Sequence, residues 1–229
     1  MLTIERRGQY AAFAALSLWA VGLTGILARS HAILFQPYFG DADPRLMVLT
    51  LIGAGGVSLH QLYARGWFDI FKADGRGAAF SATLAALFAA EAIAADLIIR
   101  FRQDMNVLPP QALWFYPAMA YVAEIVFHAL PMASLLIFLG ALFKHLRAAR
   151  LLWVCIVLTS LLEPTFQLRF AENPISWVGG YLWIHVFAFN LIQLYVFRRY
   201  GFVAMYLLRC FYYVYWHIVW GFVRLQVLF

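Results

Sequence analysis

Charged residues are scarce in this chain of 229 amino acids. Only 12% of the residues are Asp, Glu, Lys or Arg, whereas 65% are hydrophobic, and the mean hydropathy is +0.78. A water-soluble domain of this size needs a polar surface, so this composition excludes a soluble globular protein. Lipid is the solvent that can cover the excess apolar surface. We therefore expect an integral membrane protein.

Several signals of soluble enzymes and secreted scaffolds are also missing. The two cysteines, Cys155 and Cys210, lie inside apolar segments and imply no disulfide framework. The sequence has no Gly-rich phosphate loop, nucleophile elbow or Ser-His-Asp pattern, which leaves nucleotide use and serine chemistry without support. The apolar N-terminal stretch is too long for a signal peptide and is expected to be a retained span. With no low-complexity linker, residues 1–229 are predicted to form a single membrane domain.

Seven apolar stretches are long enough to cross about 30 Å of hydrocarbon, which takes about 20 residues. We predict spans at Tyr10–Leu27, Leu46–Ala64, Ala78–Ile99, Leu113–Phe143, Leu151–Phe166, Ile175–Phe197 and Phe202–Leu228. The fourth stretch is too long for an upright helix. We expect Pro131 to kink it, giving either one tilted helix or a span plus a re-entrant piece. The predicted fold class is an all-α, polytopic transmembrane helix bundle of about seven spans, with six to eight as the range.

Basic residues are distributed unequally between the two ends of these spans. With a cytoplasmic N-terminus, the inner side carries ten: Arg6, Arg7, Arg65, Lys72, Arg76, Lys144, Arg147, Arg150, Arg198 and Arg199. The outer side carries five: Arg29, Arg45, Arg100, Arg102 and Arg169. This is the bias of the positive-inside rule, and contacts with anionic headgroups account for the net charge of +6 without any nucleic acid. We expect a protein of a bacterial inner (cytoplasmic) membrane, with the N-terminus in the cytoplasm.

Acidic and imidazole side chains interrupt the third and fourth predicted spans. A charged group at the bilayer centre costs at least ~2.5 kcal/mol, so each one needs a partner or a function. Asp96 and Arg100 are four residues apart and are interpreted as an ion pair near the outer interface, with Glu91 lying deeper. Glu124 and His128 share one helix face. They could ligate a metal, form an acid–base pair or make a structural hydrogen bond.

The fifth and sixth predicted spans add one carboxylate, one imidazole and two amides. Glu163 ends the fifth stretch, either as an ordinary interfacial carboxylate or as part of a site. On the sixth span, Asn190 and Gln193 are three residues apart and are expected to join helices by hydrogen bonds. His185 on the same span could join a site.

The seventh predicted span carries a polar stripe at intervals of three or four residues. Its members are Arg209, Tyr213, His217, Trp220 and Arg224. Such a stripe must face the protein interior or a wet cavity. A buried Arg209 needs a carboxylate, and the candidates are Glu124, Glu163 and Glu91.

The polar residues of the C-terminal half follow an order that resembles a known family. The segments are Ala123-Glu124-Ile125-Val126-Phe127-His128, Thr159–Glu163, Phe197–Met205 and Arg209–Tyr213. They resemble the CAAX-protease and bacteriocin-processing (abortive-infection) superfamily of intramembrane metalloproteases, whose motifs are Glu-Glu-x-x-x-Arg, Phe-x-x-x-His and a last His-x-x-x-Asn or Asp. Glu124 matches the second glutamate, and His128 stands in place of the arginine. Glu163 stands where the second motif has histidine, and Arg209 and Tyr213 stand at the two changed positions of the third.

The resemblance implies a peptidase in which glutamates and histidines bind a metal and activate water in a cavity open to lipid. Independently of it, a pool of five side chains could supply the three or four ligands of zinc or another divalent metal: Glu124, His128, Glu163, His185 and His217. The sequence contains no His-Glu-x-x-His motif. Glu124 and His128 are the expected catalytic residues, and the expected substrate is a membrane-embedded peptide.

Two other functions are open on the sequence. The altered motifs and the aromatic seventh span favour a non-catalytic subunit or chaperone of a larger membrane complex, which would copurify with partner membrane proteins and carry no metal. Histidines from two helices could instead ligate a haem, which a visible absorption spectrum would detect. The peptidase hypothesis predicts bound metal and loss of activity on Glu124→Gln.

Overall fold

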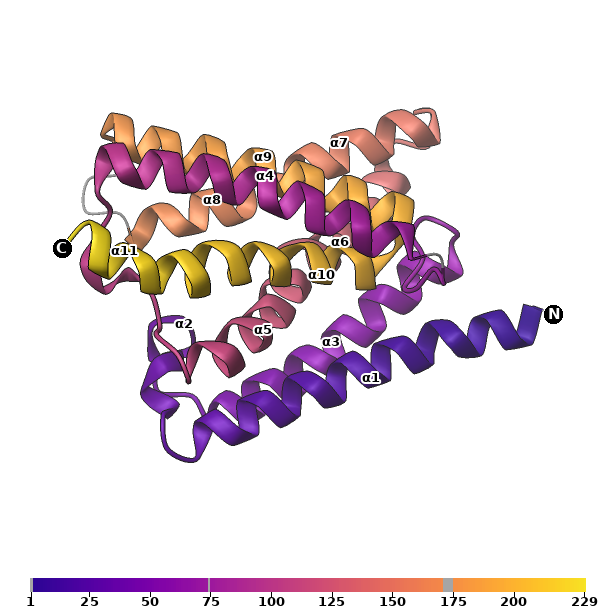
Figure 1. The fold of residues 1–229 in the computed structure, drawn as a ribbon. Helices are drawn as coiled ribbons and strands as arrows, with labels where there is room; N and C mark the ends of the chain where they lie inside the picture. The colour runs from indigo at the N-terminus through magenta and orange to yellow at the C-terminus, as the bar shows by residue number, and fades with distance from the viewer. Residues whose placement is uncertain (1, 74, 171–174) are drawn as a thin grey trace.

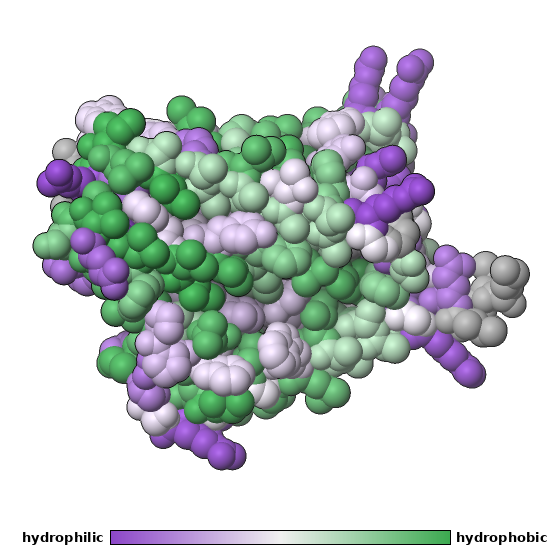
Figure 2. All heavy atoms as spheres, viewed as in Figure 1, coloured by the Kyte–Doolittle hydropathy of each residue, from purple (hydrophilic) through white to green (hydrophobic). Residues whose placement is uncertain are grey.

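A computed structural model describes residues 2–73, 75–170 and 175–229, and every regular element within these ranges is a helix. Seven helical stretches there are long and apolar enough to cross a bilayer: Glu5–Ala28, Pro44–Ala64, Arg76–Ile99, Ala112–Leu142, Ala148–Phe170, Trp177–Tyr200 and Phe202–Val227. Figure 2 shows hydrophobic residues over the middle of the molecule and hydrophilic side chains gathered at its two ends. The prediction of an integral membrane bundle of about seven spans is confirmed.

Four of the spans are single helices and three are composite. The single ones are α1 (Leu2–Ala28), α3 (Pro44–Ala64), α4 (Arg76–Ile99) and α9 (Trp177–Tyr200). The fourth span consists of α5 (Ala112–Ala123), a π-helical segment (Glu124–Ala129) and α6 (Leu130–Leu142). The fifth consists of α7 (Ala148–Ser160), α8 (Leu162–Gln167) and a 3₁₀ turn (Leu168–Phe170). The seventh consists of α10 (Phe202–Tyr213), a second π-helical segment (Val214–Trp220) and α11 (Gly221–Val227).

Short helical turns lie in two of the connections. A 3₁₀ turn (Ala32–Phe35) leads into α2 (Gln36–Phe39) between α1 and α3, and another 3₁₀ turn (Gln103–Met105) follows α4. The two chain ends lie at opposite ends of the bundle (Figure 1), as an odd number of spans requires.

The seventh span is the central element of the bundle. Half of its most apolar stretch is buried inside the protein, against a third or less for each of the other spans. Its first helix, α10, packs against α4, α5 and α9 (Figure 1). A stripe of polar residues on this span therefore meets other helices rather than lipid.

The start of α10 is fixed by a tight connection from α9. Gly201 has φ +92°, a conformation that side chains disfavour, and a Cβ there would lie 3.0 Å from the carbonyl oxygen of Ile70. The first free N–H groups of α10 donate to the 69–70 loop, Phe202 to Asp69 O at 3.1 Å and Val203 to Ile70 O at 3.0 Å. This connection sets the register at which the seventh span enters the bundle.

The fourth span widens into a π-helix just before Pro131. Proline lacks the N–H that would bond the carbonyl of Phe127, and its ring clashes there, so a regular helix is disfavoured at this point. The wider π turn accommodates the misfit. The span continues from Ala112 to Leu142 as one helical stretch. Of the two predicted alternatives, one helix or a span plus a re-entrant piece, the structure has the single helical stretch. Glu124 and His128 lie in the π segment, and both are fully buried.

Close helix contact at the Gly-Ala-Gly-Gly run of α3 provides the first test of this packing. A Cβ at Gly55 would lie 2.5 Å from Ile125 Cδ1, whereas a Cβ at Gly53 would meet nothing within 4 Å. We expect Gly55→Leu to destabilise the protein by about 1–3 kcal/mol through overpacking. Gly53→Leu is the matched control and should leave stability close to wild type. Reversible unfolding in mixed detergent micelles measures both, and equal effects would contradict the packing.

Candidate functional site

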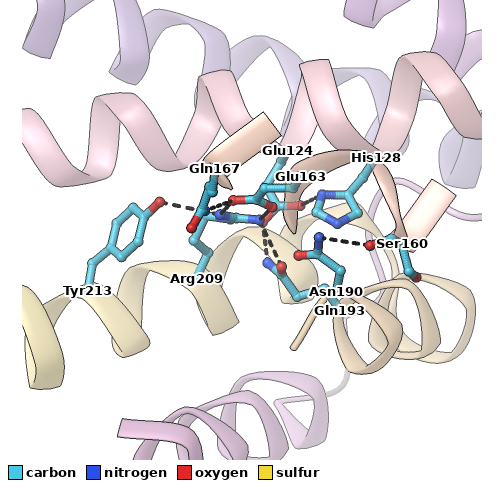
Figure 3. Close-up of polar contacts among 9 residues, drawn as sticks. All are labelled: Glu124, His128, Ser160, Glu163, Gln167, Asn190, Gln193, Arg209 and Tyr213. Carbon is cyan, nitrogen blue, oxygen red and sulfur yellow. Dashed lines mark hydrogen bonds and ion pairs between the residues drawn. The ribbon is translucent and has the colours of Figure 1, made fainter. Parts of the chain in front are cut away.

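Four spans contribute polar side chains to one buried cluster, drawn in Figure 3. We call it the Arg209 cluster; its core is Glu124, His128, Glu163, Gln193 and Arg209. Each of these side chains belongs to a residue that is at most 3% exposed. The fourth span supplies the first two, α8 the third, α9 the fourth and α10 the arginine. Burial of three or four charged groups in one place is the strongest sign of a site in this molecule.

Arg209 uses all five of its N–H donors. Its Nε donates to Glu124 Oε1 at 2.6 Å, and its two terminal nitrogens donate to the two oxygens of Glu163 at 2.7 and 2.6 Å. The remaining N–H groups donate to Gln193 Oε1 at 2.8 Å and to the Tyr213 hydroxyl at 3.3 Å. The bidentate contact with Glu163 is the geometry that suits a planar guanidinium best. The predicted need of Arg209 for a carboxylate is met twice.

Amide side chains complete the hydrogen bonding of the two carboxylates. Gln193 donates its amide to Glu124 Oε1, and Gln167 Nε2 donates to Glu163 Oε1 at 3.1 Å. Gln193 therefore contacts both the arginine and a carboxylate, a larger role than joining two helices. Gln167 stands four residues after Glu163 on α8, a spacing that could have flagged it in the sequence.

His128 is the member of the cluster whose hydrogen bonding is incomplete. Its Nδ1 lies 2.9 Å from Glu124 Oε2, so the predicted pair does lie together. The contact lacks hydrogen-bond geometry, and within the described residues neither ring nitrogen, nor Glu124 Oε2, nor Asn190 Oδ1 has a hydrogen-bond partner. Buried polar atoms are seldom left unpaired, and those that are often mark water, an ion or a functional role. With a neutral imidazole the cluster carries one net negative charge; a protonated one brings it to zero.

Asn190 connects α9 to the fifth span, as predicted for the amides of the sixth span. Its Nδ2 donates to the carbonyl oxygen of Ser160 at 3.4 Å. Pro164, four residues later, cannot donate to this carbonyl because proline has no N–H. Asn190 replaces the missing helix bond. This contact positions α8, and with it Glu163, against α9.

His185 lies outside the Arg209 cluster. Its Nδ1 is hydrogen-bonded to Glu91, and its Nε2 lies 3.0 Å from the Tyr212 hydroxyl. The Glu91 side chain is 50% exposed at the surface of α4. Of the three carboxylates considered for Arg209, Glu91 is thus the one that binds elsewhere.

His217 belongs to a third group. Its Nδ1 lies 2.6 Å from Asn106 Oδ1, and its ring stacks on Tyr116 with 4.7 Å between centroids. Gly221, one turn further, packs directly on Asn106, where a Cβ would lie 2.9 Å from Nδ2. The polar stripe of the seventh span faces inward as predicted, but its members meet different partners.

The expected ion pair between Asp96 and Arg100 is wrong. Asp96 accepts hydrogen bonds from Arg224 at 2.6 and 2.9 Å and from Trp220 Nε1 at 2.7 Å. Arg100 is exposed and ends α4 with φ 55°, a left-handed conformation. Because the helix ends there, the four-residue spacing no longer places the two side chains on one face. Arg224, fully buried, takes the carboxylate instead.

The five side chains expected to bind a metal are divided between these groups. Glu124, His128 and Glu163 lie in the Arg209 cluster, whereas His185 and His217 lie outside it. Within the described ranges, no three His, Cys, Asp or Glu side chains are placed to hold one ion. The guanidinium binds both oxygens of Glu163 and one of Glu124. Of the five predicted ligands, Glu124 and His128 are therefore the two that keep an unpartnered ligand atom in this cluster. Zinc uses three or four protein ligands.

Comparison with known proteins adds no family. No family model, no curated protein and no solved structure matches this chain. The resemblance to intramembrane metalloproteases therefore rests on the motif residues alone. At three of those positions, Arg209 contacts both Glu124 and Glu163 in the structure.

Proposed function

We propose that this protein is a non-catalytic membrane protein that binds or chaperones other membrane proteins, on a scaffold related to intramembrane metalloproteases. One observation carries the proposal: the Arg209 guanidinium lies between Glu124 and Glu163, where the three motif segments meet. A guanidinium neutralises carboxylates as a metal cation does. It has no open coordination position at which water could be polarised.

The saturation of Arg209 supports this proposal further. All five N–H donors are engaged, and four of the five bonds are 2.8 Å or shorter. Such a cluster holds four spans in a fixed arrangement and leaves little freedom for a reacting group. Another membrane protein would then contact the surface that the bundle presents to the lipid.

An intramembrane peptidase is the second candidate, and His128 is the observation that favours it. Its unpartnered ring nitrogens beside Glu124 Oε2 could serve as an acid–base pair or as two ligands of a divalent metal such as zinc. Binding a metal there requires Arg209 to release at least one carboxylate. On this candidate, a membrane-embedded peptide is cleaved and Glu124→Gln abolishes the cleavage.

Cobalt titration separates the two candidates. In detergent solution, we expect wild-type protein to show no visible Co²⁺ absorption, because Arg209 already occupies the carboxylates. Arg209→His removes the guanidinium and adds an imidazole beside Glu124, His128 and Glu163, so this variant is expected to gain a Co²⁺ band. Lys144→His, at an exposed position between spans, is the matched control and should gain none.

The opposite pattern would overturn the proposal. Stoichiometric metal in wild-type protein that is lost on Glu124→Gln would establish the metal site instead. So would cleavage of a transmembrane reporter peptide that stops on the same substitution.

A further inference from the structure

A carboxylate faces the lipid in a groove between α4 and α9. The groove encloses about 380 Å³ and is walled by apolar side chains, among them Leu87, Phe88 and Ile184. Glu91, His185 and Tyr181 are the ionisable groups in its lining, and the tyrosine hydroxyl beside Glu91 brings no charge. A half-exposed glutamate at the surface of a membrane span is costly in hydrocarbon, so its position calls for a partner.

The neighbours of Glu91 leave it with surplus negative charge. His185 Nδ1 donates to Glu91, and the Tyr212 hydroxyl lies 3.0 Å from the other ring nitrogen. In the tautomer in which the hydroxyl donates to Nε2, the imidazole is neutral and the pair carries one negative charge. The electrostatic complement of this groove is a cation or a strong hydrogen-bond donor.

The depth of Glu91 excludes the ammonium of a phospholipid as the ordinary occupant. Glu91 precedes the end of α4 at Ile99 by eight residues, or about 12 Å along the helix axis. The 24 residues of α4 span about 36 Å, only slightly more than the hydrocarbon thickness. The carboxylate therefore lies within the hydrocarbon layer, where the side chain of a transmembrane helix can reach it.

One lining residue of the groove is small. It is Ala188 on α9, whose short side chain leaves room between Ile184 and the α4 wall. Small side chains let a second helix backbone approach closely, which is how transmembrane helices associate.

We propose that a transmembrane helix of a partner protein docks in the α4–α9 groove and places a lysine or arginine against Glu91. A second copy of this chain does not supply the cation: in the described spans, Arg209 and Arg224 are buried, and the other basic residues lie within a few residues of a span end. The inference rests on the proposed function, because it names the chemistry of the partner that such a binding protein would hold.

Association of designed peptides in vesicles tests this inference. The probes are fluorescent single-span Leu/Ala peptides that carry either one lysine at the depth of Glu91 or leucine at that position, with labelled protein in phosphatidylcholine vesicles. We expect energy transfer to show about tenfold tighter association of the lysine peptide, the size of a 1–2 kcal/mol interhelical contact. Glu91→Gln should remove this preference, since it keeps the side-chain volume and removes the charge.

A variant that narrows the groove tests independently whether the peptides bind there. Ala188→Leu should weaken binding of both peptides by filling the groove, whereas Ala15→Leu, on the exposed face of α1, should not. Equal binding of the two peptides, no binding of either, or a lysine preference that survives Glu91→Gln would overturn the inference. If the peptide experiment fails and wild-type protein binds no cobalt, only the proposed chemistry of the partner is refuted. If wild-type protein binds cobalt, the proposed function itself is refuted.

Discussion

Arg209→Met is expected to lower the free energy of unfolding by about 3–5 kcal/mol, the usual loss when one partner of a buried ion pair is removed. Glu124 and Glu163 would keep their burial and lose the cation that both contact. Bulk water cannot solvate them, because both residues are at most 3% exposed. Reversible unfolding in mixed micelles, followed by tryptophan fluorescence, measures the change.

Two control variants separate the loss of charge balance from other effects of Arg209→Met. Arg150→Met, at an exposed position in the first turn of α7, is expected to change stability by no more than about 0.5 kcal/mol. Combining Arg209→Met with Glu124→Gln and Glu163→Gln should recover much of the loss, since no uncompensated charge then remains. A triple variant as unstable as Arg209→Met would show that packing, rather than charge balance, explains the effect.

Asp96→Ala is expected to be about as damaging, with a loss of about 3–5 kcal/mol. The substitution leaves Arg224 fully buried without its carboxylate and removes the acceptor of Trp220 Nε1. Because Arg224 lies on α11, the last turns of the seventh span should also open more often. Micelle unfolding gives the stability, and amide hydrogen exchange over residues 214–227 gives the local opening.

Arg100 is the control for Asp96. If the local four-residue spacing determined the pairing, Arg100→Ala would reproduce the effect of Asp96→Ala. The structure places Arg100 at the exposed end of α4, so Arg100→Ala should change stability by no more than about 0.5 kcal/mol. A large loss in this variant would contradict the contact between Asp96 and Arg224.

The spans could be predicted from the sequence because the thickness of the hydrocarbon layer sets their length. Each apolar stretch in the sequence corresponds to a helix in the structure, and the boundaries differ by a few residues. The first span, for example, begins at Glu5 rather than at Tyr10. Such differences arise where helices continue past the apolar stretch, beyond which hydropathy carries little signal.

The site could be predicted in part. The cost of burying a charge predicted that Arg209 would meet a carboxylate, and the helix repeat placed Glu124 and His128 together. Which of three carboxylates would be chosen depended on how each helix is rotated in the bundle, which no local spacing encodes. The same limit produced the wrong partner for Asp96, since Arg224 lies 128 residues away in the sequence. Pro131 signalled an irregular fourth span, but not that the irregularity would be π-helical.

The order of these partners along the chain has a consequence for biosynthesis. Asp96, Glu124 and Glu163 precede both buried arginines, so their spans leave the ribosome first. Alone, the seventh span would be poorly accepted by the translocon, since each arginine adds about 2.5–3.5 kcal/mol to the cost of insertion when it lies near the helix centre. The three carboxylates already in the membrane offset that penalty by pairing with the arginines, so the seventh span inserts against the spans made before it. A nascent chain halted before residue 202 would hold those acids without the arginines that pair with them.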